Sequence, residues 1–501
     1  MDVKAVISIL SQRYGTGINR DYYSNIDNWV AWWRGYVKVF HTFRQQDADG
    51  RLKTRQLAAM RMAKRICEDW AAVLLNEKTQ LVVDEKDGAD AMNIASLFLQ
   101  GEDGTGGVLG ANQFWARGNE LVERAFATGT GAFVLRVKNA RVAASGAIIP
   151  DHGAGVEIDY IDARGIFPIT VRRGQITECA FASEVTDKGK KYLYLETHTL
   201  EGGKYVVTNE YWEADSAKHM KRAELPEGMA ERVDTGSAVP WFALIHPAVV
   251  NNIEDNNGLG LSILAENIDI LKSIDIAYNN FQKDFLLGGK KVFYNKSMLQ
   301  TGPNGETLAP DDVCQQLFQI LGDDNNFDAK EMISEFNPSL RVEENAQGVQ
   351  RQLDYLSFKC GLGTHRYQFD GTGVARTATE YVGVRQEMVQ HAAKHMIVIE
   401  QALKTLCAGI LYIGRAFCGL PVSEEAQISV VFEDGFIVDK EAERERDRQD
   451  VRDGLMLPWE YRVKWLGETE EEARAKLIER QQEMLGLASA TSFRLNGGSE
   501  E

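Results

Sequence analysis

The chain has 501 residues, of which 44% are hydrophobic and 26% charged, and its formal net charge is −17. This length exceeds that of one ordinary hydrophobic core, and the composition is typical of folded globular proteins. A protein that grips nucleic acid usually presents Lys and Arg to the phosphates, so the acidic balance disfavours stable DNA or RNA binding. It still allows DNA to pass close by without sticking.

The cysteines and the apolar segments indicate a cytoplasmic chain. The six cysteines form no Cys-x-x-Cys pair, which predicts free thiols, and the first residues hold too short an apolar run for a signal peptide. The most apolar long window, residues 395–417, is interrupted by Glu400, Gln401 and Lys404. These polar residues argue against a membrane span, which needs about 20 mostly apolar residues.

The first half of the chain contains two types of sequence pattern, one helical and one mainly of strands. Residues 1 to about 80 are predicted to be helical, because apolar residues recur at spacings of three and four in Leu57, Met60, Ala63, Cys67, Trp70 and Leu74. From about 110 to 250, a helix gives way to runs rich in Val, Ile, Tyr, Phe and Thr, which predict antiparallel strands. The segment "LEGGKY" predicts a hairpin turn. The fold class expected is therefore α+β.

A long helix is predicted next, from Leu259 to Leu287, with Ser262 as its N-cap. At about 1.5 Å per residue it would span roughly 40 Å. Its apolar stripe is formed by Leu264, Ile268, Leu271, Ile274, Tyr278, Phe281 and Phe285. Ile263, Ile270 and Ala277 widen this stripe, so the helix is expected to pack against neighbours on more than one side.

Two further helices are predicted beyond a compact insertion. The second begins near Glu344 and carries Val349, Leu353, Leu356 and Cys360 on one face. The third is long, and its register is kept by Met388, Ala392, Met396, Ile399, Leu403, Leu406, Ile410, Ile413 and Phe417. A short strand in "AQISVVFEDGFI" follows, then a helix of alternating charge closed by Gly454, and two more short helices.

The sequence contains little that indicates catalysis. It has no Walker A phosphate loop and no G-x-S-x-G nucleophile elbow. His391 and His395 stand four residues apart on one helical face, as a zinc site requires, but no Glu separates them in the manner of H-E-x-x-H. A structural role is favoured for both, and a metal-dependent hydrolase using His391 and His395 is kept as the alternative.

A Gly-containing segment between the second and third helices is the strongest candidate for a functional loop. It has neither helical nor strand periodicity, and a loop of this length in a compact protein is usually functional or disordered. The candidate residues in it are His365, Arg366, Tyr367, Gln368, Phe369, Asp370, Gly371, Thr372, Gly373 and Arg376.

The order of these parts resembles that of bacteriophage portal proteins, particularly those of siphophages of Gram-positive hosts. The motifs that carry the resemblance are G-x-G-x-S at 258–262, "TATE" at 377–380 and "FEDG" at 432–435, in this order and spacing. The resemblance implies a portal-type fold with an α/β wing, long stem helices, a small α/β clip and a helical crown.

The resemblance also implies a division of the chain. The wing would be 1–255, the first stem helix 256–287, the clip 288–343, the second stem helix 344–363, the tunnel loop 364–377, the long helix with the wing and crown base 378–435, and the crown with the C-terminal tail 436–501. The tunnel loop would face DNA. On the first stem helix, the residues expected at the channel or at subunit contacts are Glu266, Asp269, Lys272, Asp275 and Lys283.

The function implied is a non-enzymatic conduit in the virion, assembled in the host cytoplasm, without a cofactor or a bound metal. Twelve subunits would form a ring at one capsid vertex, through which double-stranded DNA is packaged and later ejected without sequence specificity. The partners implied are the terminase large subunit, head-completion or adaptor proteins, and major capsid and scaffolding proteins; no membrane is involved. Another head-to-tail ring protein is the remaining alternative, although adaptors are usually much shorter.

The charges of the predicted stem helix agree with this function. It carries Lys272 and Lys283 against the acidic residues Glu266, Asp269, Asp275 and Asp284. A basic lining would hold DNA through counterion release, whereas this helix would let DNA slide.

Overall fold

The computed structural model divides the chain into two compact units, Met1–Glu433 and Asp434–Glu501. It describes residues 2–46, 50–76, 78–84, 93–102, 104–139, 141–143, 145–151, 153–187, 189–216, 219–227, 229–295, 317–320, 333–369, 378–423, 426–432 and 440–479. Each unit is described by itself.

The described part of the first unit begins with seven helices, two of which, α1 and α2, pack on a large antiparallel sheet. The helices are α1 (Val3–Tyr14), α2 (Arg20–Trp33), α3 (Lys38–His41), α4 (Met62–Leu74), α5 (Ile94–Gln100), α6 (Gly107–Ala111) and α7 (Phe114–Thr128). Asp2 and Asn19 cap α1 and α2 by accepting backbone N–H bonds in the first turn. Both helices bury their apolar faces in one core with the sheet, which includes Val6, Trp29, Phe167 and Phe181.

The sheets follow the expected antiparallel pattern. The largest contains β8 (Ile166–Arg172), β9 (Gln175–Asp187), β10 (Lys190–Glu201), β11 (Lys204–Ser216), β12 (His219–Ala223) and β13 (Arg232–Asp234) in the order β12-β11-β10-β9-β8, with β13 also on β11. The predicted "LEGGKY" hairpin is confirmed, since Glu201 pairs with Lys204 across Gly202 and Gly203, whose φ angles are 59° and 81°. A short 3₁₀ helix, η1 (Ala163–Gly165), leads into β8.

Smaller sheets complete this unit. β14 (Phe242–Ile245), β4 (Gly131–Lys138) and β7 (Gly155–Asp162) form a three-stranded sheet in that order. β5 (Arg141–Val142) pairs with β6 (Ile148–Ile149), and β3 (Gln80–Asp84) pairs with β18 (Gln427–Val431). The strand predicted near 427 is therefore confirmed, and it joins two segments far apart in the sequence.

The all-helical interpretation of residues 1–80 is wrong for one segment. β1 (Thr42–Gln46) and β2 (Leu52–Gln56) form an antiparallel hairpin, with Gly50 at a φ of 78° near its turn. This hairpin has mostly exposed polar side chains on both faces, so it lacks the alternation of apolar and polar residues that identifies a half-buried strand. Helix α4 also starts only at Met62, after Leu57 and Met60.

The first long helix is shorter than predicted. α8 runs over Ile268–Leu287, preceded by the 3₁₀ helix η2 (Ala265–Asn267), so its 20 residues span roughly 30 Å. Ser262 is not its N-cap: its Oγ accepts from Leu264 N at 3.1 Å and donates to Ala127 O at 2.6 Å. The segment before η2 does not continue the helix, because Leu259, Leu261 and Leu264 are buried in the core of the first unit.

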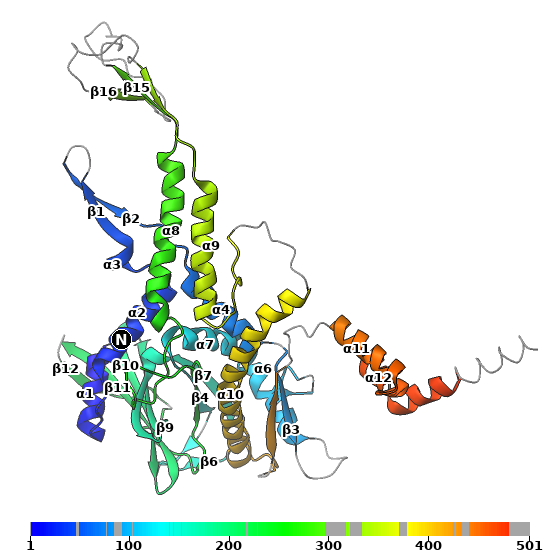
Figure 1. Cartoon of the computed structure of the whole chain (residues 1–501). Coiled ribbons are helices and arrows are strands. Elements are labelled where there is room, and N and C mark those ends of the chain that lie inside the picture. The colour runs from blue at the N-terminus through cyan, green and yellow to red at the C-terminus, as the bar shows by residue number, and fades with distance from the viewer. Residues whose placement is uncertain are drawn as a thin grey trace, which may run out of the picture. The chain divides into compact units, whose positions relative to one another are not determined.

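Three short strands and two helices follow α8. β15 (Lys291–Asn295), β16 (Leu317–Ile320) and β17 (Ile333–Phe336) form a sheet in the order β16-β15-β17, parallel between β15 and β16. α9 (Val342–Lys359) begins two residues before the predicted start, and its predicted face, Val349, Leu353, Leu356 and Cys360, is buried. α8 and α9 run side by side, and the sheet is attached where α8 ends and α9 begins (Figure 1).

The third predicted helix is α10 (Ala378–Ala416), 39 residues long. Of its predicted face, all residues except Met396 are buried, among them Leu403, Ile410 and Ile413 with no exposed surface. It packs across the three-stranded sheet of β14, β4 and β7. The part of α10 from Glu387 to Ala416 is apolar and long enough to cross a membrane, yet half of its most apolar window is buried inside the protein, as in the core helix of a soluble protein.

The second unit is helical in the part that the structure describes. It contains α11 (Lys440–Asp453), α12 (Pro458–Leu466) and a helical segment at 470–479. Gly454 closes α11 as predicted, with a φ of 76°. Asp447 of α11 joins it to α12 by accepting from Lys464 Nζ at 2.7 Å and from Trp465 Nε1 at 2.6 Å.

Candidate functional site: the helix pair and the segment after it

The pair α8 and α9 is held together at two levels. Along its length, Leu271 and Ile274 of α8 and Leu353 of α9 are buried. Where α8 ends, the Asp284 carboxylate accepts from Arg341 N at 2.9 Å, Arg341 Nη2 at 3.0 Å and Asn345 Nδ2 at 3.2 Å. The hydrogen bonds from Arg341 lower the pKa of Asp284. This clamp fixes the two helix ends from which the β15–β17 sheet is carried.

The five predicted stem residues occupy different surroundings. Asp269 is 93% exposed in its side chain and pairs with Lys272 Nζ at 2.8 Å. Glu266 accepts from Asn252 Nδ2 at 2.6 Å. Lys283 places its Nζ 5.7 Å from the centre of the Phe43 ring in the β1–β2 hairpin. Four of the five are therefore at or near the surface of the subunit.

Asp275 differs from the other four, because it is buried in its own chain. Its Oδ2 lies 2.9 Å from His41 Nε2 and its Oδ1 accepts from Met60 N at 2.7 Å. Burial raises the pKa of Asp275, and the Met60 and His41 hydrogen bonds oppose that effect. The carboxylate thus fastens α8 to α3 and to the segment before α4, in contrast to the channel or subunit position expected from the sequence.

The segment 364–369 is bound to the neighbouring helices. His365, at a φ of 63°, lies with its Nδ1 2.9 Å from Asp354 Oδ1. Arg366 Nη2 lies 3.4 Å from Asp69 Oδ1. Tyr367 is buried, and burial together with the charge of Asp69 raises its pKa far above the usual value.

Gln350 of α9 completes this attachment. Its Nε2 donates to Tyr367 O at 2.8 Å and its Oε1 accepts from Phe369 N at 2.7 Å. The Phe369 ring lies edge-on to Phe281 of α8, with centroids 5.4 Å apart. Gln368, which lies between Tyr367 and Phe369 in the sequence, is exposed. The other predicted loop residues lie outside the described residues: Asp370, Gly371, Thr372, Gly373 and Arg376.

His391 and His395 do not form a metal site with other ligands in the part of the chain that the structure describes, where no group of three His, Cys, Asp or Glu could hold an ion. His395 is buried between the rings of Trp70 and Phe126, at 4.7 and 4.9 Å, and its Nδ1 accepts from Ala248 N at 2.9 Å. Burial, with smaller contributions from His391 and His246, lowers its pKa to about 3. These surroundings are those of a neutral core histidine.

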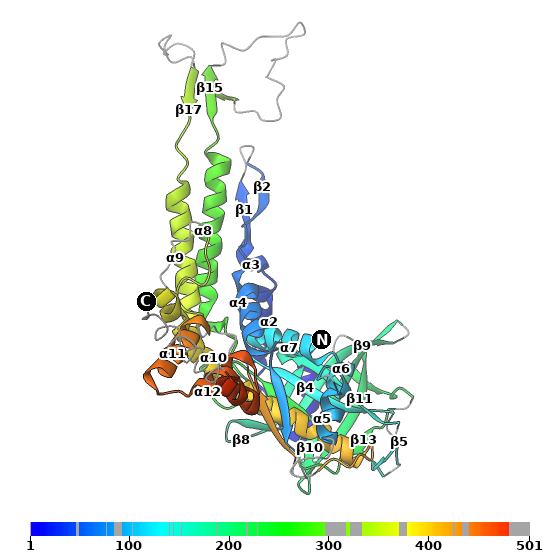
Figure 2. The same ribbon diagram turned by 90° about the vertical axis from the view of Figure 1, so that its right-hand side faces the viewer.

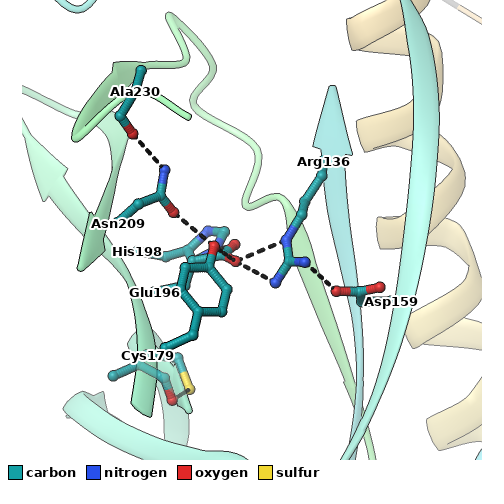
Figure 3. A network of polar contacts seen from close by, with 9 residues as sticks. Arg136, Asp159, Cys179, Glu196, His198, Asn209 and Ala230 are labelled. Atoms are coloured by element: carbon teal, nitrogen blue, oxygen red, sulfur yellow. Dashed lines mark hydrogen bonds and ion pairs between the residues drawn. The ribbon is translucent and has the colours of Figure 1, made fainter. Parts of the chain in front are cut away.

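A buried ionic network between β4, β7 and β10 was not predicted from the sequence (Figure 3). Glu196 Oε2 accepts from Arg136 Nε at 2.9 Å and Nη2 at 2.6 Å, and its Oε1 lies 2.7 Å from His198 Nε2. Burial alone would raise the pKa of Glu196, but the Arg136 charge and the His198 hydrogen bond outweigh it and lower the pKa to about 2. Asp159 binds the other side of Arg136.

The only sequence signal for this network is charged and polar residues at inward positions of strands, as at Glu196 and His198 in β10. The ion pairs of Arg136 with Glu196 and Asp159 join β4, β10 and β7, so we assign the network a structural role, although the buried His198 Nδ1 has no hydrogen-bond partner among the described residues. The five described cysteines, Cys67, Cys179, Cys360, Cys407 and Cys418, are free, as predicted; Cys314 lies outside the described residues.

The protein family of the chain follows from its match to a family model. The family model described as phage portal protein, SPP1 Gp6-like, matches residues 17–486. The chain belongs to the phage portal protein family. A search of curated individual proteins gave no match.

As a portal protein, the chain is a component of the phage capsid, and its family is structural rather than a known enzyme family. Membership implies a capsid-associated oligomeric ring through which DNA passes. The match spans most of the first unit, including the α8–α9 pair and α10, and part of the second unit. It therefore confirms the resemblance drawn from the motifs at 258–262, 377–380 and 432–435.

Proposed function

We propose that twelve copies of this chain form a ring at one capsid vertex, which conducts double-stranded DNA during packaging and ejection. The observation that carries the proposal is the family match over 17–486, which includes the packed pair α8 and α9. In the ring, α8 and α9 act as the stem, and residues 1–255 act as the wing. The DNA-pumping ATPase belongs to a partner, since the sequence has no Walker A loop.

The segment 288–343 acts as the clip in this proposal. Its position between the ends of α8 and α9 supports this role, because a sheet carried on two clamped helix ends projects from the stem. There it meets the terminase large subunit during packaging and the head-completion or adaptor proteins afterwards. Major capsid and scaffolding proteins contact the ring during assembly, and residues 436–501 form the crown.

The segment 364–377 acts as the tunnel loop, with the DNA-facing role assigned to its part beyond Phe369. Support comes from the attachment of 365–369 to α8, α9 and Asp69, which gives a loop a fixed base. His365, Arg366 and Tyr367 then act as anchors more than as DNA contacts. The remaining candidates, Asp370, Gly371, Thr372, Gly373 and Arg376, supply the reach toward DNA.

Electron microscopy of the purified chain tests the ring. Negative-stain images are expected to show closed rings with a central channel, and native mass measurement is expected to give an even, twelve-fold assembly. A chain that stays monomeric across protein and salt concentrations would contradict the proposal.

A further inference from the structure

The β1–β2 hairpin makes few contacts within its own chain. The described side chains from Arg44 to Gln46 and from Gly50 to Gln56 are all exposed, and Leu52 is 67% exposed. A single two-stranded hairpin is marginally stable in water, because it buries little apolar area. The hairpin therefore gains stability from any surface that covers it.

The two faces of the hairpin have different surroundings. Residues directly opposite each other share a face, so Phe43 and Arg55 lie on one, and the pairs Arg44–Thr54 and Gln46–Leu52 on the other. Lys283 of α8 lies over the Phe43 ring. The face with Arg44 and Leu52 is consequently turned away from α8. Arg44 has no ion-pair partner among the described residues.

The outer face of α9 is the second uncovered surface. Tyr355 and Phe358 are 53% and 47% exposed, although aromatic side chains of this size favour burial. Glu344 stands in the first turn of the same helix, eleven residues before Tyr355, and is exposed. Three helical turns separate the two, which places them on one side of α9. This surface therefore carries Glu344 at its start, the basic Arg351 in its middle and the two aromatic side chains further along.

The hairpin and the start of α9 lie at the same level of α8. Lys283 reaches Phe43, while the next residue, Asp284, binds Arg341 and Asn345. Both views show α8 between the hairpin and α9 (Figure 1, Figure 2). One subunit thus presents the hairpin with Arg44 on one flank and the start of α9 with Glu344, of opposite charge, on the other flank.

We propose that the Arg44–Leu52 face of the hairpin packs on the outer face of α9 in a neighbouring copy of the chain. The inference rests on the proposed ring and names one interface of it. Two different flanks that recognise each other make a head-to-tail contact, which forms a ring when the rotation between neighbouring copies closes. Arg44 then faces Glu344 in the first turn of α9, and the exposed side chains on this face of the hairpin lose contact with water.

Charge reversal tests the contact. Arg44→Glu and Glu344→Arg, each alone, are expected to lower the fraction of chain in rings by about tenfold at fixed protein concentration, because like charges then meet at every interface. An equal mixture of the two variants is expected to regain rings. When the two variants alternate in a ring of even number, the two reversed charges meet at one interface and the two original charges meet at the next. Opposite charges therefore face each other at every interface of the mixed ring. The double variant in one chain is expected to form rings alone.

Mass photometry and negative-stain images measure the ring fraction, and circular dichroism checks that each variant is folded. Lys204→Glu, an exposed change of the same sign as Arg44→Glu at the turn between β10 and β11, is the control and is expected to leave the rings intact. Single variants that form rings like the unchanged chain, or a mixture that fails to regain them, would overturn this interface while leaving the ring in place. If the unchanged chain forms no rings, the proposed function itself fails, and this inference with it.

Discussion

Glu196 illustrates how a buried charge is made tolerable in the wing. Its side chain is almost fully buried, yet two nitrogens of Arg136, the Tyr194 hydroxyl and His198 surround the carboxylate. The Arg136 guanidinium is in turn shared with Asp159 and lies over the Tyr194 ring. A buried ion pair of this kind adds little stability compared with a well-packed apolar core. Removing one partner is nevertheless costly, because the other is left as a buried charge without a counter-charge.

The Glu196 network predicts a specific acid sensitivity. Because the pKa of Glu196 is about 2 when folded and 4.5 in its reference state, its ionised form stabilises the fold above pH 4.5, and this stabilisation is lost as the pH falls toward 2. Glu196→Gln is expected to lower the free energy of unfolding at pH 7 by about 3 kcal/mol and to flatten the pH dependence in that window. Urea titrations at several pH values measure both.

The exposed pair Lys138–Glu157 supplies the matched control. Its atoms are 3.2 Å apart, and both side chains are more than half exposed. Glu157→Gln is expected to change the unfolding free energy by less than about 1 kcal/mol. Equal losses in the two variants would show that Glu196 acts as a surface charge.

His395 predicts a second pH window, which begins at a higher pH than that of Glu196 and overlaps it below pH 4.5. Its folded pKa of about 3 lies below the usual 6.5, so the folded state binds fewer protons than the unfolded state between these values. The stabilisation is complete above pH 6.5 and is lost as the pH falls toward 3, by up to about 1.4 kcal/mol per pH unit. His395→Gln is expected to remove this slope between pH 6 and 4.5, above the window of Glu196. A variant that keeps the full slope would contradict the assignment.

At the scale of elements, helices with a buried apolar stripe were predictable, and segments shaped by tertiary contacts were not. α9 and α10 match their predicted faces because the buried apolar residues of each helix, such as Leu353 in α9 and Ile410 in α10, recur at helical spacing. The start of α8 was misplaced by nine residues, since the apolar residues from Leu259 to Leu264 pack into the wing instead of continuing a helix. Periodicity alone does not distinguish these two uses of apolar residues.

The candidate site was predictable only in part, for a related reason. The glycine-containing segment after α9 marked the loop, but the bonds from Gln350 to Tyr367 and Phe369 join residues of no distinctive pattern. In the sequence, Asp275 cannot be distinguished from an acidic residue on the exposed face of a helix. Only the fold brings His41 and Met60 next to it. Pairings across 200 residues leave no local signal in one sequence.

The anchored base of the loop leads to a prediction about its tip. Removing residues 371–374 leaves Phe369 and its contacts with Gln350 and Phe281 in place, so rings are expected to form normally. DNA packaging by proheads that contain the shortened chain is expected to fall, because the loop no longer reaches the DNA. Replacing 371–374 by Ser-Gly-Ser-Gly restores the length and is the control. Normal packaging with the deletion would contradict a role of this loop in DNA packaging.

At the scale of the whole molecule, net charge is the property that connects composition with DNA conduction. The chain carries 73 acidic and 56 basic residues. A ring of such chains repels phosphates at long range, and only a local cluster of Lys and Arg would hold DNA in place. The exposed Asp269, paired with Lys272, keeps the exposed part of α8 near neutrality at that level.

We expect the proposed ring to bind linear double-stranded DNA weakly and a charge change on α8 to reverse this behaviour. Asp269→Lys leaves Lys272 without its partner and adds two positive charges per subunit, twelve times over in the proposed ring. The variant ring is expected to retain DNA at low salt, with an affinity that falls steeply as salt is added, because counterions are released on binding. Gel mobility shifts at several salt concentrations measure the slope. Glu227→Lys, an equal change in an exposed wing loop, separates position from net charge: if both variants bind alike, total charge governs binding, and if neither binds, the exposed part of α8 near Asp269 does not face the DNA.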